Sequence, residues 1–222
     1  MESCCINPFQ EHKKNQNVEI LHTQSPVVSK INNLILPDEA DYLINKAQEI
    51  GLKKSTVTDG KGGNKLHPSR TSSTAFLPKG HDDVITCIET RIATNADELR
   101  ENLEPLQVTE YKKKEKYDYH HDYLPNVQPG KGQRTKTVFS YLKGLEHDGG
   151  EVCGGGTAFP KLKNEENETV RVYPVSGNAV MWSNVTAEGK VDNMTLHGGE
   201  EVLCENVRKI GLNAWFRDKA WN

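Results

Sequence analysis

Two histidines and a carboxylate are the side chains of this sequence best suited to chemistry. His120 and Asp122 stand two residues apart in an aromatic stretch, residues 117–123, that is predicted to be extended. Side chains two apart on a strand share a face, so these two would converge while His121 points away. With His197 they would supply two imidazoles and one carboxylate. That set can hold non-haem Fe(II) and leaves positions open for substrate and O2.

A lysine further along the chain indicates an anionic ligand. Lys209 begins a predicted strand, 209–217, whose side chains alternate between small and large as at the mouth of a barrel. An ammonium that points inward is costly unless it meets an anion, and a dicarboxylate co-substrate would provide one. The alternative is a lysine at a strand edge that points into water, and the sequence leaves both open.

Composition limits the partners of the protein. The 28 Lys and Arg residues nearly balance the 31 Asp and Glu residues, so there is no basic footprint of the kind that binds nucleic acid. No apolar run approaches the roughly 18 residues that a membrane span needs. Residues 1–18 are polar, without the apolar core of a signal peptide, and are expected to form a flexible arm before a single domain, 19–222. The sequence does not set the oligomeric state, and a monomer is compatible with it.

The five cysteines lack the paired spacing of a zinc site. Cys87 falls on a predicted helix face and is expected to be a buried thiol. Cys153 and Cys204 could meet in a disulfide, which the sequence neither requires nor excludes. Triplets of the N-glycosylation type begin at Asn167, Asn184 and Asn193. They permit a secretory context without establishing one.

The elements that must position these residues fall into two blocks. Strand and helix patterns alternate first, at 27–36 and 37–51 and again at 70–77 and 82–94. After Pro105 the pattern changes to short strands separated by Gly and Pro turns. These strands are predicted at 106–111, 117–123, 135–142, 157–160, 169–174, 179–183, 195–198 and 210–217. Helices followed by antiparallel strands indicate an α+β fold, here a double-stranded β-helix, or jelly roll, with the helices packed on one sheet.

Several short motifs occur in a fixed order along the chain. They are RTSS with FL at 70–77, LQVxxY at 106–111, HxD at 120–122, RTxT with YL at 134–142, GGTAFP at 155–160, PxxGxA at 174–179, and LHGG followed by Lys209 and Trp215. In this order they resemble the catalytic domain of collagen-type prolyl 4-hydroxylases, over about residues 28–218. Single motifs are weak signals, and their common order is what makes the resemblance specific.

The resemblance implies a role for each matched residue. The Fe(II) ligands would be His120, Asp122 and His197. Lys209 would pair with the distal carboxylate of 2-oxoglutarate through a charge-assisted bond. Tyr111 and Thr157 would hydrogen-bond the same carboxylate. The residues near the peptide substrate would be Tyr117, Arg134 and Trp215.

The resemblance also implies a reaction. Proline in a Pro-rich peptide or protein would be hydroxylated with O2 and 2-oxoglutarate, giving 4-hydroxyproline, succinate and CO2, with ascorbate as reductant. Such a substrate would arrive as a polyproline-II helix, and the Gly- and Lys-rich loop 56–69 would act as a lid. By analogy with the family the compartment would be the endoplasmic reticulum or secretory pathway, although the chain shows no signal peptide.

Two other functions compete with this one. The same iron and co-substrate could serve hydroxylation of another protein side chain or of a small molecule. A peptide-binding module without catalysis could keep the fold, but the complete ligand set argues against it. The sequence also departs from the family pattern in the long loop 146–156 and in Glu200-Glu201, where Cys-Pro is common. Because Lys209 comes later after His197 than usual, Arg208 is the alternative anchor.

Overall fold

The structure is a computed structural model that describes residues 18–58, 63–127, 130–145 and 153–221. The two helices are α2 (Pro37–Ile50) and α3 (Asp83–Ala96), and the short 3-10 helices are η1 (Arg100–Asn102) and η2 (Asn193–Thr195). The strands before residue 100 are β1 (Val18–His22), β2 (Val28–Ile31), β3 (Lys53–Lys54), β4 (Val57–Thr58), β5 (Asn64–Lys65) and β6 (Ser73–Phe76). The later strands are β7 (Gln107–Tyr111), β8 (Tyr117–His120), β9 (Arg134–Lys143), β10 (Thr157–Lys163), β11 (Thr169–Val172), β12 (Ala179–Ser183), β13 (His197–Gly199) and β14 (Lys209–Arg217).

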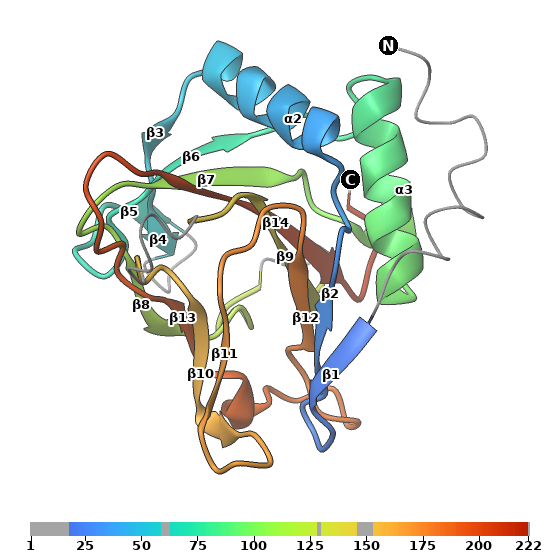
Figure 1. Ribbon diagram of the computed structural model, residues 1–222. Helices are drawn as coiled ribbons and strands as arrows, with labels where there is room; N and C mark the ends of the chain where they lie inside the picture. Colours follow the sequence, from blue (N-terminus) through green and yellow to red (C-terminus); the bar gives the residue numbers. More distant parts are fainter. Residues whose placement is uncertain (1–17, 59–62, 128–129, 146–152, 222) are drawn as a thin grey trace.

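Two antiparallel sheets form the body of the protein. The larger has the order β1-β2-β12-β9-β14-β7-β6-β3 and the smaller has the order β11-β10-β13-β8. Helices α2 and α3 cover the outer side of the larger sheet, and the smaller sheet lies on its opposite side (Figure 1). This is the jelly roll with helices on one sheet that the sequence predicts, and the fold class is confirmed.

Three apolar clusters hold these layers together. The first joins the helices to the larger sheet through residues such as Leu43, Ile88 and Leu212. The second fills the space between the sheets, where Phe159 meets Trp182 edge to face. The third surrounds Tyr111 close to the chemistry-bearing residues. The central strand β9 is therefore packed on both faces, through Val138 and Leu142 in the first cluster and Phe139 and Tyr141 in the second.

The ends of several predicted elements differ from the structure. Helix α2 begins at Pro37 and its C-cap is Gly51, as expected, with φ +90° at the glycine. The strand predicted at 117–123 is wrong in its last part, because β8 ends at His120 and a bend follows. The strand predicted at 195–198 is shifted, because Thr195 closes η2 and β13 begins at His197. The segment predicted as a loop from residue 56 carries β4 and β5, a small hairpin.

The first strand begins at Val18, the last residue assigned to the flexible arm; the rest of the predicted arm lies outside the described residues. No helix in the described part of the chain has the length and apolar character to cross a membrane.

Candidate active site

Three side chains converge where β8 and β13 lie side by side in the smaller sheet. His120 and His197 are directly paired across these antiparallel strands, and their ring centroids are 4.4 Å apart. Asp122 reaches them from the bend after β8. Its Oδ1 lies 3.7 Å from His120 Nε2, and its Oδ2 lies 3.7 Å from His197 Nε2. The ligand atoms all lie within 4.8 Å of one another, which is a geometry that can hold a metal ion.

Both imidazoles are held in the tautomer that a metal requires. His120 Nδ1 lies 2.8 Å from the carbonyl oxygen of Asp118, and His197 Nδ1 lies 2.9 Å from that of Thr195. A carbonyl only accepts, so each Nδ1 carries the proton and each Nε2 presents a lone pair to the cluster. Burial lowers the pKa of His120 to about 3, with the neighbouring His197 adding to the effect, and burial likewise lowers the pKa of His197. The rings are therefore neutral and ready to bind a cation.

The carboxylate of the cluster is ionised. Burial alone would raise the pKa of Asp122, but electrostatic interactions of the carboxylate with the two imidazoles and with the Arg134 guanidinium outweigh it and lower this pKa to about 2. Thr137 also donates a hydrogen bond to Oδ2 at 2.7 Å. Asp122 thus supplies a hard anionic ligand beside two neutral nitrogens.

A buried cation stands at the start of β14, close to the strand of His197. Lys209 is only 1% exposed and is paired across strands with Tyr111, whose ring centroid lies 4.7 Å from the ammonium. The ammonium donates to the carbonyl of Gly155 at 2.6 Å. Burial lowers the pKa of Lys209 to about 7, although Glu200 acts in the opposite direction. A bound carboxylate would relieve this desolvation.

The space beside this ammonium is kept open by a glycine. A Cβ on Gly199, in the same strand as His197, would lie 3.7 Å from Lys209 Nζ and 3.8 Å from Tyr111 Oη. Thr157 is paired across strands with Gly199, and its hydroxyl accepts a hydrogen bond from Tyr141 at 2.8 Å. The ammonium of Lys209 and the hydroxyl of Tyr111 therefore lie next to Gly199, which itself carries no side chain, and Thr157 is its neighbour on β10. A cation beside hydroxyl groups is a donor set that fits a carboxylate.

A cavity of about 410 Å³ opens beside Asp122 of the cluster. Its lining includes Asp122, His121 and two pairs in which an arginine lies over an aromatic ring. Arg70 lies 4.6 Å from the Tyr117 ring, and Arg134 lies 3.7 Å from the Trp215 ring. The Tyr117 ring also stacks on His120, with centroids 3.6 Å apart. An elongated substrate in this cavity would thus lie against stacked arginine and aromatic side chains next to the His-Asp-His cluster.

The comparisons with known proteins agree with this geometry. The family model described as the 2OG-Fe(II) oxygenase superfamily matches residues 106–217, which hold the cluster and Lys209. The chain belongs to this superfamily. Prolyl 4-hydroxylase 5 of Arabidopsis thaliana is 35% identical over 196 residues, covering 83% of this chain and 66% of the relative. Probable prolyl 4-hydroxylase 10 of the same plant is 34% identical over 226 residues, covering 94% of this chain and 74% of the relative.

A solved structure has the same fold. The viral collagen prolyl hydroxylase of Paramecium Bursaria Chlorella virus-1, in its 2OG complex, is 26% identical and has a TM-score of 0.64. The match covers 86% of this chain and 95% of the viral chain. The protein is thus an oxygenase of the iron- and 2-oxoglutarate-dependent dioxygenase class.

The structure brings together all the site residues that the sequence of this oxygenase singles out. Their roles stay predictions. His121 takes no part in the cluster and instead lines the cavity. Arg208 lies at the surface and donates to Glu110 at 3.0 Å, so Lys209 is the cation that faces inward. Thr56, Val57 and Asn64 of the proposed lid line the cavity.

The sequence did not indicate that Glu104 holds two of the arginines that line the cavity, Arg134 and Arg217. Glu104 is 4% exposed and accepts from Arg134 Nε at 2.6 Å and from Arg217 Nε at 2.7 Å. Its position directly before the Pro105-Leu106 start of the strand block was the available signal, because an acid next to a buried strand needs a partner. Glu104 thereby holds the Arg134 guanidinium over the Trp215 ring.

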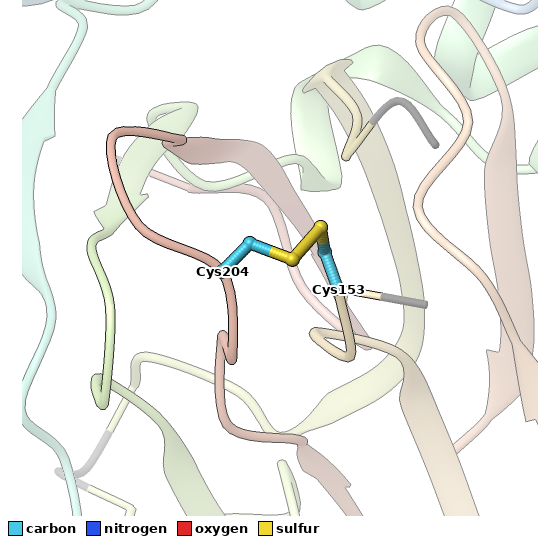
Figure 2. Close-up of a disulfide and its surroundings, with 2 residues drawn as sticks. All are labelled: Cys153 and Cys204. Atoms are coloured by element: carbon cyan, nitrogen blue, oxygen red, sulfur yellow. A yellow bond between two sulfur atoms is a disulfide. The ribbon is translucent and has the colours of Figure 1, made fainter. Parts of the chain in front are cut away.

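The disulfide that the sequence left open is present in the oxygenase. Cys153 and Cys204 are bonded and join the segment before β10 to the loop before β14 (Figure 2). Backbone hydrogen bonds run alongside, from Leu203 N to Cys153 O at 2.8 Å and from Gly155 N to Glu201 O at 2.9 Å. Cys153 therefore lies two residues before Gly155, whose carbonyl oxygen accepts a hydrogen bond from Lys209.

Removing this disulfide should destabilise the oxygenase and loosen the backbone at Gly155, which contacts Lys209. The bond closes a sequence separation of 51 residues, and for such a loop we expect the C153A/C204A double variant to lose about 2–4 kcal/mol of unfolding free energy. Denaturant unfolding under non-reducing conditions measures this loss. A variant with the midpoint of the parent protein would show that the disulfide adds nothing to the hydrogen bonds beside it.

Proposed function

We propose that this protein is a prolyl 4-hydroxylase that acts on Pro-rich peptides or proteins. One observation carries the proposal: the His-Asp-His cluster shares its strands with a glycine that lies next to a buried ammonium, and its carboxylate lines an aromatic cavity. The ammonium side suits 2-oxoglutarate, and the cavity side suits an extended peptide. The relatives with the same fold and motifs are prolyl 4-hydroxylases, and this supports proline as the target.

In this proposal His120, Asp122 and His197 hold Fe(II) through two Nε2 atoms and one carboxylate oxygen. When bound, the iron supplies the O2 chemistry that couples decarboxylation of 2-oxoglutarate to hydroxylation, with ascorbate as reductant. The two backbone carbonyls behind the histidines keep their tautomers fixed. With only these three side chains as ligands, a bound Fe(II) would keep coordination positions free for 2-oxoglutarate and O2.

Lys209 binds the distal carboxylate of the co-substrate, assisted by the hydroxyls of Tyr111 and Thr157. Burial raises the pKa of Tyr111, so its phenol stays protonated and can donate. The Thr157 hydroxyl lies 2.8 Å from that of Tyr141, which also lies 3.1 Å from the carbonyl oxygen of Val172. When Tyr141 donates to Thr157, the threonine keeps its own proton for the carboxylate. The pocket thus presents one cation and two donors to a carboxylate in a dry site.

The peptide lies in the cavity beside Tyr117, Arg134 and Trp215. A Pro-rich segment adopts a polyproline-II helix at low entropic cost, and its pyrrolidine rings pack well on aromatic faces. Burial raises the pKa of Tyr117 to about 12, so the ring beside His120 remains neutral at working pH. Tyr117 is thus placed to orient the proline next to the metal.

Succinate release with a panel of Pro-rich peptides tests the proposal. The assay contains Fe(II), 2-oxoglutarate and ascorbate, and each peptide has a matched control in which alanine replaces every proline. We expect stimulation by the proline peptides alone and 4-hydroxyproline in the product hydrolysate. Turnover that no such peptide stimulates would reject prolyl hydroxylation. Stimulation by a small molecule or another side chain instead would support the alternative hydroxylase.

A further inference from the structure

A buried chain of hydrogen bonds runs behind the carboxylate of the metal cluster. Asn184, just after β12, donates from Nδ2 to the hydroxyl of Thr137 on β9 at 2.9 Å. Thr137 donates in turn to Asp122 Oδ2 at 2.7 Å. Thr137 and Asn184 are both 0% exposed. Water is thus kept from these two groups, and the chain ends on a residue of the cluster.

The direction of this chain follows from what each group can donate. An ionised carboxylate only accepts, so the single hydroxyl proton of Thr137 must point to Asp122. The hydroxyl oxygen then needs a donor, which is the amide nitrogen of Asn184. If the amide of Asn184 were turned round, its oxygen would face the Thr137 hydroxyl. The single hydroxyl proton would then have to serve both this oxygen and the carboxylate of Asp122. The donors therefore all point toward Asp122, and each hydrogen bond strengthens the next.

The need for such an anchor is visible in the symmetry of the cluster. The two oxygens of Asp122 face the two histidines at the same distance, 3.7 Å each. Without another contact the carboxylate could bind a metal through either oxygen, or through both. A second oxygen on the metal would take a position that the co-substrate or O2 needs. The Thr137 hydrogen bond distinguishes the two oxygens, because it occupies a lone pair of Oδ2 and leaves Oδ1 available to a metal.

The strands also explain why Thr137 is a rigid anchor. β9 lies between β12 and β14, and Thr137 is paired with Trp182 on one side and with Trp215 on the other. Asp122, in contrast, follows the end of β8 and has no strand partner of its own among the described pairings. The contact from Thr137 thus ties a residue in a bend to a central strand.

We propose that Thr137, held by Asn184, is a positioning residue that reserves Oδ2 of Asp122 and presents Oδ1 alone to the metal. This inference rests on the proposed metal site. Groups of this kind typically change metal affinity by about 10–100-fold when they are removed. Thr137 touches neither substrate nor the reacting atoms, and it acts through Asp122.

Titration of the metal-free protein with Mn(II) and with Co(II) tests the proposal without turnover. Thr137→Val keeps the shape and removes the hydroxyl, and we expect about 10–100-fold weaker binding. The Co(II) absorption band should also change, because the freed carboxylate can bind through both oxygens. Thr137→Ser keeps the hydroxyl and should restore the parent affinity and spectrum. Asn184→Leu should fall between parent and Thr137→Val, because the hydroxyl then loses its partner.

A matched control exists on β7. Thr109 is also 0% exposed and also accepts from an asparagine amide, that of Asn213 at 3.2 Å, but it does not contact Asp122. Thr109→Val should therefore lose stability without losing metal affinity. Circular dichroism on every variant separates loss of the fold from loss of binding.

Each outcome decides the proposal. Parent affinity and spectrum in Thr137→Val would overturn it. A Thr137→Ser variant as weak as Thr137→Val would also overturn it, because shape and not the hydroxyl would then matter. Parent affinity in Asn184→Leu would show that Asn184 is not needed to hold Thr137, and that part of the proposal would be rejected. If the parent protein itself bound neither ion, the proposed metal site would fail together with this inference.

Discussion

Replacing His120 by alanine should abolish Fe(II) binding and reduce succinate formation to background. The variant leaves one nitrogen and one carboxylate, and the loss should exceed the about 10–100-fold typical of residues that only support a ligand. The Tyr117 ring that stacks on His120 would also lose its support. Metal content after dialysis, and succinate release with saturating 2-oxoglutarate, measure the two effects.

His121→Ala is the matched control, because it removes the adjacent imidazole. His121 lines the cavity and contacts the carbonyl of Asn193 at 3.4 Å, outside the cluster. We expect this variant to keep its metal, whatever it does to the KM for the peptide. Normal metal binding by His120→Ala, or loss of metal in His121→Ala, would show that the cluster has been assigned wrongly.

Lys209→Met should raise the KM for 2-oxoglutarate by about 10²–10³-fold, the usual cost of removing one partner of a buried charge pair. Methionine keeps the length of the side chain, so packing against the Tyr111 ring changes little. The kcat at saturating co-substrate should change less than the KM. Arg208→Met is the control, because Arg208 points to the surface. If Arg208→Met raised the KM and Lys209→Met did not, the anchor would be Arg208.

The pH dependence of co-substrate binding gives a second measurement on Lys209. Its pKa in the free protein is lowered to about 7, so above pH 7 the amine is mostly neutral and must take up a proton to bind a carboxylate. Affinity for 2-oxoglutarate should therefore fall as the pH rises above 7, while below 7 this dependence disappears. Calorimetry of the Mn(II)-loaded protein at pH 8, in buffers of different ionisation enthalpy, should show uptake of nearly one proton. Lys209→Met should show none.

Much of the fold could be predicted because the pattern of each long strand is local. The small and large side chains of β14 and the apolar stripe of α2 are visible within the segments themselves. The two-residue strands β3, β4 and β5 were missed, because two residues are too few to show an alternation of apolar and polar side chains. Lys53–Lys54 becomes a strand through pairing with β6, which lies far along the chain.

The site was predictable as a set of residue types and only partly as a geometry. Strand alternation gave the correct partner for His120 by an incomplete argument, since Asp122 lies past the strand end and is brought back by a bend. The support from Asn184 to Thr137 spans 47 residues of sequence and leaves no local pattern. The same holds for Glu104, whose two arginine partners belong to other strands.

The burial of Asn184 determines whether this asparagine can carry an N-linked glycan. Asn184-Val185-Thr186 has the form of a glycosylation acceptor, and the atom that would carry the sugar is the Nδ2 that donates to Thr137. With 0% exposure, this residue has no room for a glycan in the folded protein. Asn167 and Asn193, in contrast, are exposed. A sugar on Asn184 is therefore incompatible with the native fold, because its Nδ2 is buried against Thr137.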